Sequence, residues 1–559
     1  MKRIIGIDLG TTNSAAAFWD GDEPRIIPND RGKSLTPSVV SWTPDGEVLV
    51  GESAKNQSVL HIDRTVSQVK RSMGTGASFV IDDHSYSPVD VSSLILAKLK
   101  LDAEKFLGES IERAVITVPA HYGESARAAT IKAGQACGLE VVRILNEPTA
   151  AALCEAGRTE GRRRILVYDL GGGTFDATCL HQDGRAYTVK STAGDRELGG
   201  LDFDAMLLEE VLEAFAKQTD IELRAHPALL QQIRDSVERA KVELSSRLSA
   251  DVSLPFIGTG GSAVHLSHTI SREAFSQLVA PLLRKTIKIT LQVVREAGFG
   301  VQGIDALIVS GGSSRIPLVH TYLQRSLGLD EVHMINPDEV VALGAAVQAG
   351  MIERGIDTVR VTDVAPQSLG VETFGDCFVP IVRRNTPIPA RSRRVFTTVS
   401  DNQTVVEIHV LQGESELVSE NTSLGRFVLS GIRKAAQGQA RIEVGFSVNE
   451  DGLVEVDAHD VDTGVRHSVS IEASEQSLGS GSHESEIEGI RARVQMLFDR
   501  LRSEIDEDLA EETSHFLNLA WTVGDADTER RYEIVAALGA LADELSSYAD
   551  VAEVRSGTA

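Results

Sequence analysis

The chain reads Leu166-Val167-Tyr168-Asp169-Leu170-Gly171-Gly172-Gly173-Thr174-Phe175-Asp176 in its interior and Ile4-Ile5-Gly6-Ile7-Asp8-Leu9-Gly10-Thr11-Thr12-Asn13 near residue 1. Both stretches predict an apolar strand that ends in an aspartate, then a glycine and threonine turn, then a second apolar strand. Glycine lets the backbone approach a ligand closely, and consecutive free N–H groups form a concavity that binds anions. Two such turns that face each other predict a clamp for a phosphate chain.

The two aspartates, Asp8 and Asp169, cannot bind phosphate directly because like charges repel. They can hold a divalent cation through water, because magnesium keeps much of its hydration shell. The alternative interpretation is a pair of ordinary hairpins with glycine turns, and the matching of the two turns makes it the weaker one. A Walker loop is excluded, since it needs a Gly-Lys-Ser/Thr sequence between a strand and a helix.

Composition narrows the class of protein. The 559 residues suggest several domains. A net charge of −26 argues against broad binding to nucleic acid or to anionic membranes. Aromatic residues make up 5% of the chain, too few for dense stacking platforms for single strands. Solubility alone explains the acidity.

The cysteines and the start of the chain bear on the compartment. Cys137, Cys154, Cys179 and Cys377 are scattered without metal-ligand spacing or a disulfide framework, which fits a reducing cytoplasm. The start, Met1-Lys2-Arg3-Ile4, is not expected to be a signal peptide, because Asp8 interrupts the apolar run. No apolar run is long enough to span a bilayer.

The pattern of residues changes along the chain. Up to about Gly355, predicted strands such as Ala114 to Pro119 alternate with helical patterns such as Ser125 to Cys137, which is typical of an α/β domain. Val361 to Ile471 is rich in Thr, Val, Ser and Gly and predicts an all-β domain. A polar Ser/Gly stretch follows, and apolar residues recur at helical spacing from Glu484 onward.

Four sets of residues together resemble the seventy-kilodalton heat-shock chaperone family, and within it the bacterial DnaK-type members. They are the two phosphate turns, Ile116-Thr117-Val118-Pro119-Ala120, Leu145-Asn146-Glu147-Pro148-Thr149-Ala150-Ala151-Ala152, and Val309-Ser310-Gly311-Gly312-Ser313-Ser314-Arg315-Ile316-Pro317. Their order and spacing agree with the family from Met1 to about Ile471.

The resemblance implies an α/β actin-like, two-lobed ATPase domain, followed by a β-sandwich peptide-binding domain and a short α-helical C-terminal lid. The expected division is residues 1–356 for the nucleotide-binding domain, 357–364 for the interdomain linker, 365–473 for the β-sandwich, 474–483 for the Ser/Gly linker and 484–559 for the lid.

The resemblance also implies roles at a site for ATP or ADP with Mg²⁺ and K⁺. Asp8 and Asp169 would position the ions, mostly through water; Lys70 would orient the attacking water, and Glu147 would lie near it. The phosphates would be held by Gly10, Thr11, Thr12, Asn13, Gly171, Gly172, Gly173 and Thr174, and the adenosine by Glu238, Lys241, Ser245, Gly311, Gly312, Ser313, Arg315 and Asp338; the predicted nucleotide-binding set also includes Gly199 and Gly200.

The resemblance implies two further sets of residues, one that couples the domains and one that binds client peptides. Pro119 and Arg127 match a proline switch and its arginine relay, Arg143 matches an arginine that contacts the linker and a J-domain partner, and Asp363 matches the linker aspartate. The apolar peptide cleft would be formed by Val371, Phe396, Val406 and Ile408, with Phe374 and Val399 as the arch above it.

The chain departs from the family in four places. The linker reads Val359-Arg360-Val361-Thr362-Asp363 instead of a run of leucines, so we expect weaker coupling. Phe374 and Val399 replace smaller or more flexible arch residues, so the arch is expected to be narrower or more permanently closed. The segment between Gly74 and Val91 is shortened, and the tail from Glu484 is too short for a full lid.

The sequence thus predicts an ATP-dependent chaperone that binds extended apolar segments of unfolded polypeptides, with a J-domain co-chaperone and a nucleotide exchange factor as implied partners. One alternative is a specialised or regulatory chaperone-like ATPase with a dedicated client and weak coupling. Alternatives of another class are an actin-like filament-forming ATPase or a sugar kinase, and the β domain after Asp363 argues against both.

Overall fold

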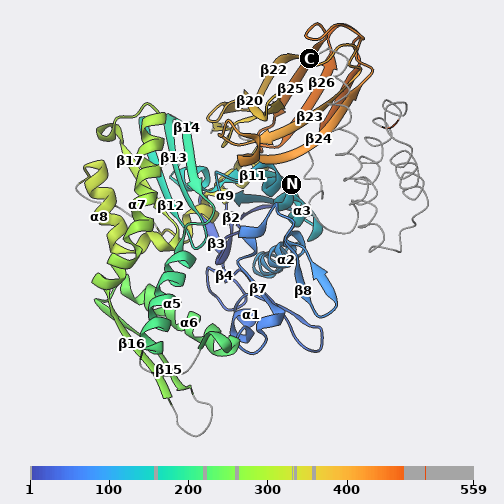
Figure 1. Ribbon diagram of the computed structural model, residues 1–559. Helices are drawn as coiled ribbons and strands as arrows, with labels where there is room; N and C mark the ends of the chain where they lie inside the picture. The colour runs from blue at the N-terminus through green and yellow to red at the C-terminus, as the bar shows by residue number, and fades with distance from the viewer. Residues whose placement is uncertain are drawn as a thin grey trace. The chain divides into compact units, whose positions relative to one another are not determined.

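The computed structural model describes residues 3–155, 161–217, 219, 223–257, 264–329, 332, 336–355, 360–470 and 498 (Figure 1). Residues 1–474 form one compact unit and residues 475–559 form a second. The predicted Ser/Gly linker (474–483) and the predicted lid (484–559) lie outside the described residues, apart from the single helical residue Phe498.

The first glycine turn joins two strands of a six-stranded sheet. β1 (Ile4–Asp8) pairs antiparallel with β2 (Asn13–Trp19), as predicted from the apolar runs on either side of the turn. β10 (Arg113–Val118) pairs parallel with β1, and β11 (Glu140–Asn146) pairs parallel with β10. The path is completed by β3 (Pro24–Ile27), while β4 (Thr36–Pro37) pairs with β2.

The second glycine turn has the same surroundings. β12 (Arg162–Leu170) pairs antiparallel with β13 (Phe175–Asp183), and β17 (Ala306–Ser310) lies parallel to β12. β14 (Ala186–Asp195) extends this sheet beyond β13. Because each lobe repeats a hairpin with a parallel neighbour, the ends of β1 and β12 carry their aspartates to equivalent places.

Helices cover the two sheets, and small residues allow close packing. In α9 (Val340–Arg354), the Ala345 and Ala346 backbone lies so near Gly6 of β1 that a Cβ on this glycine would be 2.3 Å from the Ala346 nitrogen. Ser87 and Asp90 form a capping box that starts α2 (Pro88–Leu107). The remaining longer helices are α3 (Glu124–Ala136), α4 (Glu147–Cys154), α5 (Gly200–Ala216), α6 (Pro227–Leu244), α7 (Arg272–Glu296) and α8 (Pro317–Leu327).

The all-β region is a sandwich of two four-stranded sheets, as predicted. One sheet has the order β20-β19-β23-β24 and the other β22-β25-β26-β27. Alternating residues from both sheets form its core, including Leu369, Val410 and Phe446. The strands are β19 (Leu369–Thr373), β20 (Cys377–Val382), β22 (Ala390–Thr397), β23 (Val405–Gln412), β24 (Thr422–Ser430), β25 (Arg441–Val448), β26 (Val454–Asp460) and β27 (Arg466–Ser470).

The described part of the interdomain linker is a strand, β18 (Arg360–Val364). It pairs parallel with β14 through residues 360–362 and antiparallel with β21 (Pro387–Ile388) through Asp363 and Val364. The second sheet therefore runs in the order β17-β12-β13-β14-β18-β21. Among the described residues, no helix is both long enough and apolar enough to cross a membrane.

Candidate functional site

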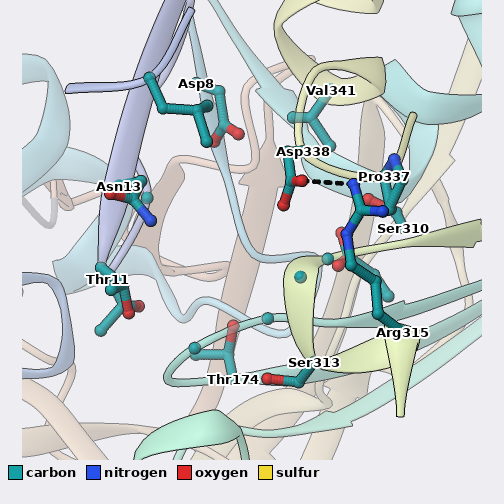
Figure 2. A pocket seen from close by; sticks show the side chains of 18 of the residues that line it. Asp8, Thr11, Asn13, Thr174, Ser310, Ser313, Arg315, Pro337, Asp338 and Val341 are labelled. Atoms are coloured by element: carbon teal, nitrogen blue, oxygen red, sulfur yellow. Dashed lines mark hydrogen bonds and ion pairs between the residues drawn. The ribbon is translucent and has the colours of Figure 1, made fainter. Parts of the chain in front are cut away.

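A cavity of about 330 Å³ lies between the two glycine turns (Figure 2). Asp8, Thr11 and Asn13 border one side of it, and Ser310, Arg315 and Asp338 border the other. The structure therefore brings the predicted phosphate and adenosine residues to one place. Its lining includes Asp8, Gly10, Thr11, Thr12, Asn13, Lys70, Glu147, Asp169, Gly171, Gly172, Thr174, Glu238, Lys241, Ser245, Gly311, Gly312, Ser313, Arg315 and Asp338.

The two turns touch each other, as a clamp requires. A Cβ on Gly172 would lie 2.0 Å from the Thr12 hydroxyl oxygen, and one on Gly173 would lie 2.5 Å from the Thr11 methyl carbon. Only glycine fits in the second turn at this separation. The Thr12 hydroxyl is buried and has no hydrogen-bond partner among the described residues. A buried polar atom facing a cavity is typical of a site that a polar ligand completes.

Three carboxylates, Asp8, Glu147 and Asp169, face this cavity together. Burial, together with the nearby Asp176 and Asp8 charges, raises the pKa of Asp169 to about 7. Burial likewise raises the pKa of Glu147 to about 8 and raises that of Asp8. Lys70 lowers the pKa of each of the three, as do hydrogen bonds from Thr117 to Asp8 and from Ser310 to Asp169, but burial outweighs them. If all three carboxylates were ionised, one lysine could not balance their charge.

Lys70 is buried, with 4% of its surface exposed, which a lysine tolerates only when it is paired. Its ammonium group forms an ion pair with Glu147. Burial alone would lower the pKa of Lys70, but Glu147, Tyr122 and Asp8 outweigh it and hold that pKa above its usual value. The Tyr122 hydroxyl donates a 2.5 Å hydrogen bond to the Lys70 carbonyl oxygen and fixes the short helix η2 (Val69–Ser72).

The donor set fits a hydrated divalent cation. The described residues contain no group of three or more His, Cys, Asp or Glu side chains close enough to hold a metal directly. Carboxylates that surround a cavity at greater distances bind magnesium through its water shell. Excess negative charge at Asp8 and Asp169 favours such an ion, and the ion would in turn keep both side chains ionised.

The predicted adenosine side of the cavity is built from α6 and the loop after β17. Glu238, Lys241 and Ser245 lie on one face of the helix, as their spacing predicts, and line the cavity. Glu238 also pairs with Lys55 of the first lobe at 2.8 Å. Opposite them, Arg315 forms a 2.6 Å ion pair with Asp338, which fixes its guanidinium plane at the cavity wall (Figure 2).

Three of the predicted nucleotide-binding residues do not line the cavity. Gly173 belongs to the second turn and packs against Thr11, whereas Gly199 and Gly200 lie next to that turn, and the Gly200 N–H donates a 3.0 Å hydrogen bond to the Gly171 carbonyl. A Cβ on Gly199 would lie 2.6 Å from the Gly172 carbonyl oxygen. In this structure these glycines pack closely against the turn or its neighbours, and their direct contact with nucleotide stays a prediction.

Arg71 was missed as a site residue, although it follows Lys70 in the sequence. Its guanidinium donates to the Gly173 carbonyl at 2.8 and 3.0 Å and pairs with Asp202 at 2.6 Å. Since Asp202 caps the start of α5 through the Gly199 N–H, Arg71 ties the first lobe to the second glycine turn. The sequence signal was only the adjacent basic pair, which does not reveal a contact 102 residues away.

The predicted coupling residues Arg127 and Asp363 are joined by a side chain that the sequence did not single out. Arg127 donates to the Asn146 side-chain oxygen at 2.7 Å, and the Asn146 amide donates to Asp363 at 2.7 Å. Thr149 donates a further hydrogen bond to Asp363 at 3.1 Å. Burial raises the pKa of Asp363, against the effect of these donors and of Arg127. The linker strand is thus connected to the residue that precedes Glu147.

Arg127 also holds the segment around Pro119. It donates to the Tyr122 carbonyl at 3.0 Å and to the Ala120 carbonyl at 3.2 Å, while the Tyr122 N–H donates to the Pro119 carbonyl at 3.1 Å. Its remaining N–H group donates to the Asp451 carbonyl of the β-sandwich at 3.2 Å. One buried guanidinium therefore contacts the Pro119 segment, Asn146 and the sandwich together.

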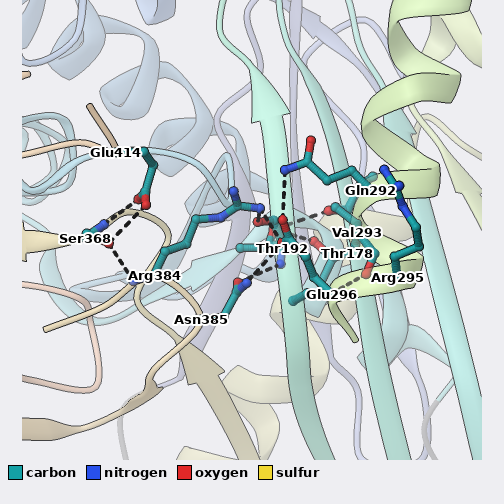
Figure 3. Close-up of polar contacts among 12 residues, drawn as sticks. Thr178, Thr192, Gln292, Val293, Arg295, Glu296, Ser368, Arg384, Asn385 and Glu414 are labelled. Carbon is teal, nitrogen blue, oxygen red and sulfur yellow. Dashed lines mark hydrogen bonds and ion pairs between the residues drawn. The ribbon is translucent and has the colours of Figure 1, made fainter. Parts of the chain in front are cut away.

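The sandwich contacts both lobes. In the first lobe, Arg143 pairs with Glu450 at 2.5 Å, and the Ile144 N–H donates to Asp451 at 3.0 Å. In the second lobe, Arg384 pairs with Glu296 at 2.7 Å and donates to the Thr192 carbonyl at 3.0 Å (Figure 3). These contacts explain why residues 1–474 are one compact unit.

A second cavity, of about 640 Å³, opens on the β-sandwich, and all six predicted peptide-binding residues line it. Val371 and Ile408 form its floor and are part of the sandwich core, whereas Phe396 and Val406 are half-buried. The arch residues differ from the prediction of a narrow or closed arch. Phe374 exposes 88% and Val399 52% of their surface, so these side chains do not pack together over the cavity.

A family model with the description Hsp70 protein matches residues 4–85 and 75–519. The match includes both glycine turns, the linker strand and the whole β-sandwich. The chain belongs to the Hsp70 family. Membership supports a chaperone function, ATP binding and ATPase activity at the level of the family.

Two departures from the Hsp70 pattern can be placed in the structure. The linker residues Arg360 and Thr362 do not prevent docking, because β18 pairs with β14 through main-chain groups. Val242 of α6 stands where the resemblance implies a longer basic or isoleucine side chain; it lines the cavity between the glycine turns and is 62% exposed.

Proposed function

We propose that the protein is an ATP-dependent chaperone, in which hydrolysis of ATP controls the binding and release of extended apolar segments of unfolded polypeptides. The observation that carries the proposal is the connection between two cavities of different chemistry. The first, called here the charged cavity, lies between the glycine turns and is lined by Glu147. Asn146, which precedes Glu147, bonds to Asp363 of the linker strand. That strand leads directly into the sandwich, which holds the second, apolar cavity.

The charged cavity suits phosphoryl transfer from ATP. In our proposal the β- and γ-phosphates lie between the turns, where Thr11, Thr12, Asn13 and Thr174 offer hydroxyl, amide and backbone donors. A hydrated Mg²⁺ ion held by Asp8 and Asp169 would supply charge neutralisation when bound, and K⁺ ions would lie near the same carboxylates. Adenosine lies between the α6 face and the Arg315–Asp338 pair.

Lys70 and Glu147 act as a unit in this proposal. The ammonium group is protonated because Glu147 and the surrounding acids keep its pKa high, so it stabilises charge on the γ-phosphate and orients a water beside it. Glu147 fixes the position of the ammonium nitrogen through their ion pair. Positioning of this kind supplies most of the rate enhancement in phosphoryl transfer.

The apolar cavity suits an extended peptide. Its floor of Val371 and Ile408 offers an apolar surface, and Phe374 and Val399 are exposed and free to contact a bound chain. Such recognition combines main-chain hydrogen bonds with a pocket for one or two side chains. We propose unfolded or extended polypeptides as clients, a J-domain co-chaperone and an exchange factor as partners, and the cytoplasm as the compartment, with the division into domains given above.

Measurement of ATP hydrolysis with and without an unfolded peptide tests the proposal. We expect hydrolysis that the peptide stimulates, and loss of both basal and stimulated hydrolysis in Lys70→Ala. The matched control is Lys105→Ala, which removes an exposed lysine on α2 and leaves the rates unchanged. Stimulated hydrolysis that persists in Lys70→Ala contradicts the role of Lys70, and capture of a single stable client in place of many unfolded ones supports the dedicated-client alternative.

A further inference from the structure

His121 lies between the two lobes, and the proposed function gives it no role. Its imidazole is buried, with 8% of the residue exposed, and its Nδ1 lies 2.7 Å from an Asp176 carboxylate oxygen. The His121 backbone N–H donates to the same oxygen at 3.3 Å. His121 belongs to the segment after β10 in the first lobe, whereas Asp176 belongs to β13 in the second. The pair therefore joins the two lobes inside the protein.

The second ring nitrogen of His121 has no partner. Nε2 is buried and makes no hydrogen bond with any described residue. Because the carboxylate accepts the hydrogen bond at Nδ1, the proton of a neutral imidazole lies on Nδ1 and Nε2 keeps an unpaired acceptor. A histidine that fails to satisfy one nitrogen is poorly explained as a simple core residue. The hydrogen bond to Asp176 explains why a histidine occupies this buried position.

Asp176 connects the pair to the reaction centre. It stands directly opposite Asp169 in the β12–β13 ladder and follows Thr174 by two residues. Gly194 lies opposite Asp176 on its other side, and a Cβ there would be 2.5 Å from His121 Nδ1 and 2.7 Å from the Asp176 oxygen. The pair is thus enclosed beside the strand that follows the second glycine turn.

The other side of His121 leads to Lys70 and to the linker. The next residue, Tyr122, donates its hydroxyl hydrogen to the Lys70 carbonyl, and its own carbonyl accepts from Arg127. Arg127 in turn contacts Asn146, the partner of Asp363 in the linker strand. His121 therefore lies where the linker contacts, the Lys70 backbone and the second phosphate turn meet.

We propose that His121 is a positioning residue for ATP hydrolysis. Its Nδ1–H bond to Asp176 holds the second phosphate turn in register with Lys70. The inference rests on the proposed hydrolysis of ATP. It assigns to His121 no contact with nucleotide or with the reacting atoms.

Single-turnover ATP hydrolysis by the full chain tests this role with two amide variants. In His121→Asn the amide nitrogen takes the place of Nδ1, whereas in His121→Gln it reaches toward the place of Nε2. We expect His121→Asn to hydrolyse ATP within about threefold of the unmodified protein and His121→Gln to be roughly tenfold to a hundredfold slower, the range for loss of a hydrogen bond to a charged group. The ATP Kd is expected to change by less than about threefold in both, because the lost contact acts in the transition state.

His121→Phe keeps a ring of similar size without a donor and should match His121→Gln. The control is His84→Phe, at an exposed site on β9 (His84–Tyr86), and it should leave the rate unchanged. Folded His121→Gln that hydrolyses ATP as fast as His121→Asn overturns the inference. A uniform loss of ATP affinity at an unchanged rate also overturns it. If the unmodified protein itself does not hydrolyse ATP, the proposed function fails and this inference falls with it.

Discussion

Asn146 donates a 2.7 Å hydrogen bond to Asp363, and the two residues are 217 positions apart in the chain. Asn146 precedes Glu147, the partner of Lys70, whereas Asp363 lies in the strand that links the nucleotide lobes to the β-sandwich. A single amide side chain therefore stands between the charged cavity and the linker. Arg127 approaches it from the other side, so the amide satisfies a cation and an anion together.

Removal of the Asn146 amide should abolish communication between the cavity at the glycine turns and the peptide cavity of the β-sandwich. In Asn146→Ala, Arg127 and Asp363 each lose a buried partner, which costs about 1 to 3 kcal/mol of folding free energy. We expect basal ATP hydrolysis to persist and its stimulation by peptide to disappear. Thermal unfolding and the stimulated rate check the two parts. Asn56→Ala, in an exposed position of α1 (Glu52–Gln57), is the control, and stimulation that survives in Asn146→Ala contradicts the role.

The buried carboxylates predict a pH dependence of stability without nucleotide. The pKa of Asp169 rises from 3.8 to about 7 on folding, so the folded protein keeps a proton that the unfolded chain releases in this range. The contribution of Asp169 to stability is therefore greatest at low pH and falls as the pH rises toward 7. Asp169→Asn should stabilise the nucleotide-free protein by up to about 4 kcal/mol at pH 8, since one pKa unit corresponds to about 1.4 kcal/mol and the rise is about three units.

Thermal unfolding between pH 5 and pH 8 checks this prediction. The gain in Asp169→Asn should shrink as the pH falls below 7, and Mg-ATP should stabilise the unmodified protein but not the variant. Asp83→Asn, at an exposed position, should change neither curve. A gain that is the same at pH 5 and pH 8 would show that charge at residue 169 is not its cause.

The linker strand predicts different effects for its two unusual residues. Arg360 is exposed, whereas Thr362 is half-buried beside β14. Thr362→Leu should strengthen docking by about 0.5 to 1.5 kcal/mol through added apolar burial. Arg360→Leu has no apolar surface to cover and serves as the matched control. Hydrogen exchange at the linker amides reports docking, and equal protection in both variants would contradict this difference between their sites.

The peptide cavity predicts a separation between stability and client binding. Phe374 is 88% exposed, so Phe374→Ala should change the free energy of unfolding by less than about 0.5 kcal/mol. It should weaken binding of an apolar peptide roughly tenfold if the side chain closes on the bound peptide. Ile408→Ala removes a core side chain and should cost about 2 to 5 kcal/mol of stability. Thermal unfolding and fluorescence anisotropy with a labelled peptide measure the two effects, and unchanged peptide affinity in Phe374→Ala excludes a part for the arch.

The sequence predicts well those features that depend on neighbouring residues. The two strand–glycine–strand turns, the helical face of Glu238, Lys241 and Ser245, and the β-sandwich are confirmed because each depends on a periodicity or a turn within a short window. The family resemblance is confirmed as well. The roles given to individual site residues stay predictions, although the structure places most of them around one cavity.

Long-range contacts are what the sequence alone cannot supply. Nothing in the local pattern shows that Arg71 reaches Gly173, that His121 reaches Asp176, or that Asn146 joins Arg127 to Asp363. The places of Gly199 and Gly200 also depend on how α5 packs behind the turn. The arch prediction was wrong for this structure because side-chain size alone does not determine whether two loop residues meet.

The linker is a strand held on both edges, by β14 on one side and β21 on the other. A tether in this form cannot swing freely, because separation of the sandwich from the lobes must break a row of main-chain hydrogen bonds together. Release of the linker strand is then cooperative, so states in which only part of the strand has detached are poorly populated. The protein should consequently respond to a pulling force or to a competing strand with an abrupt transition and not with gradual loosening.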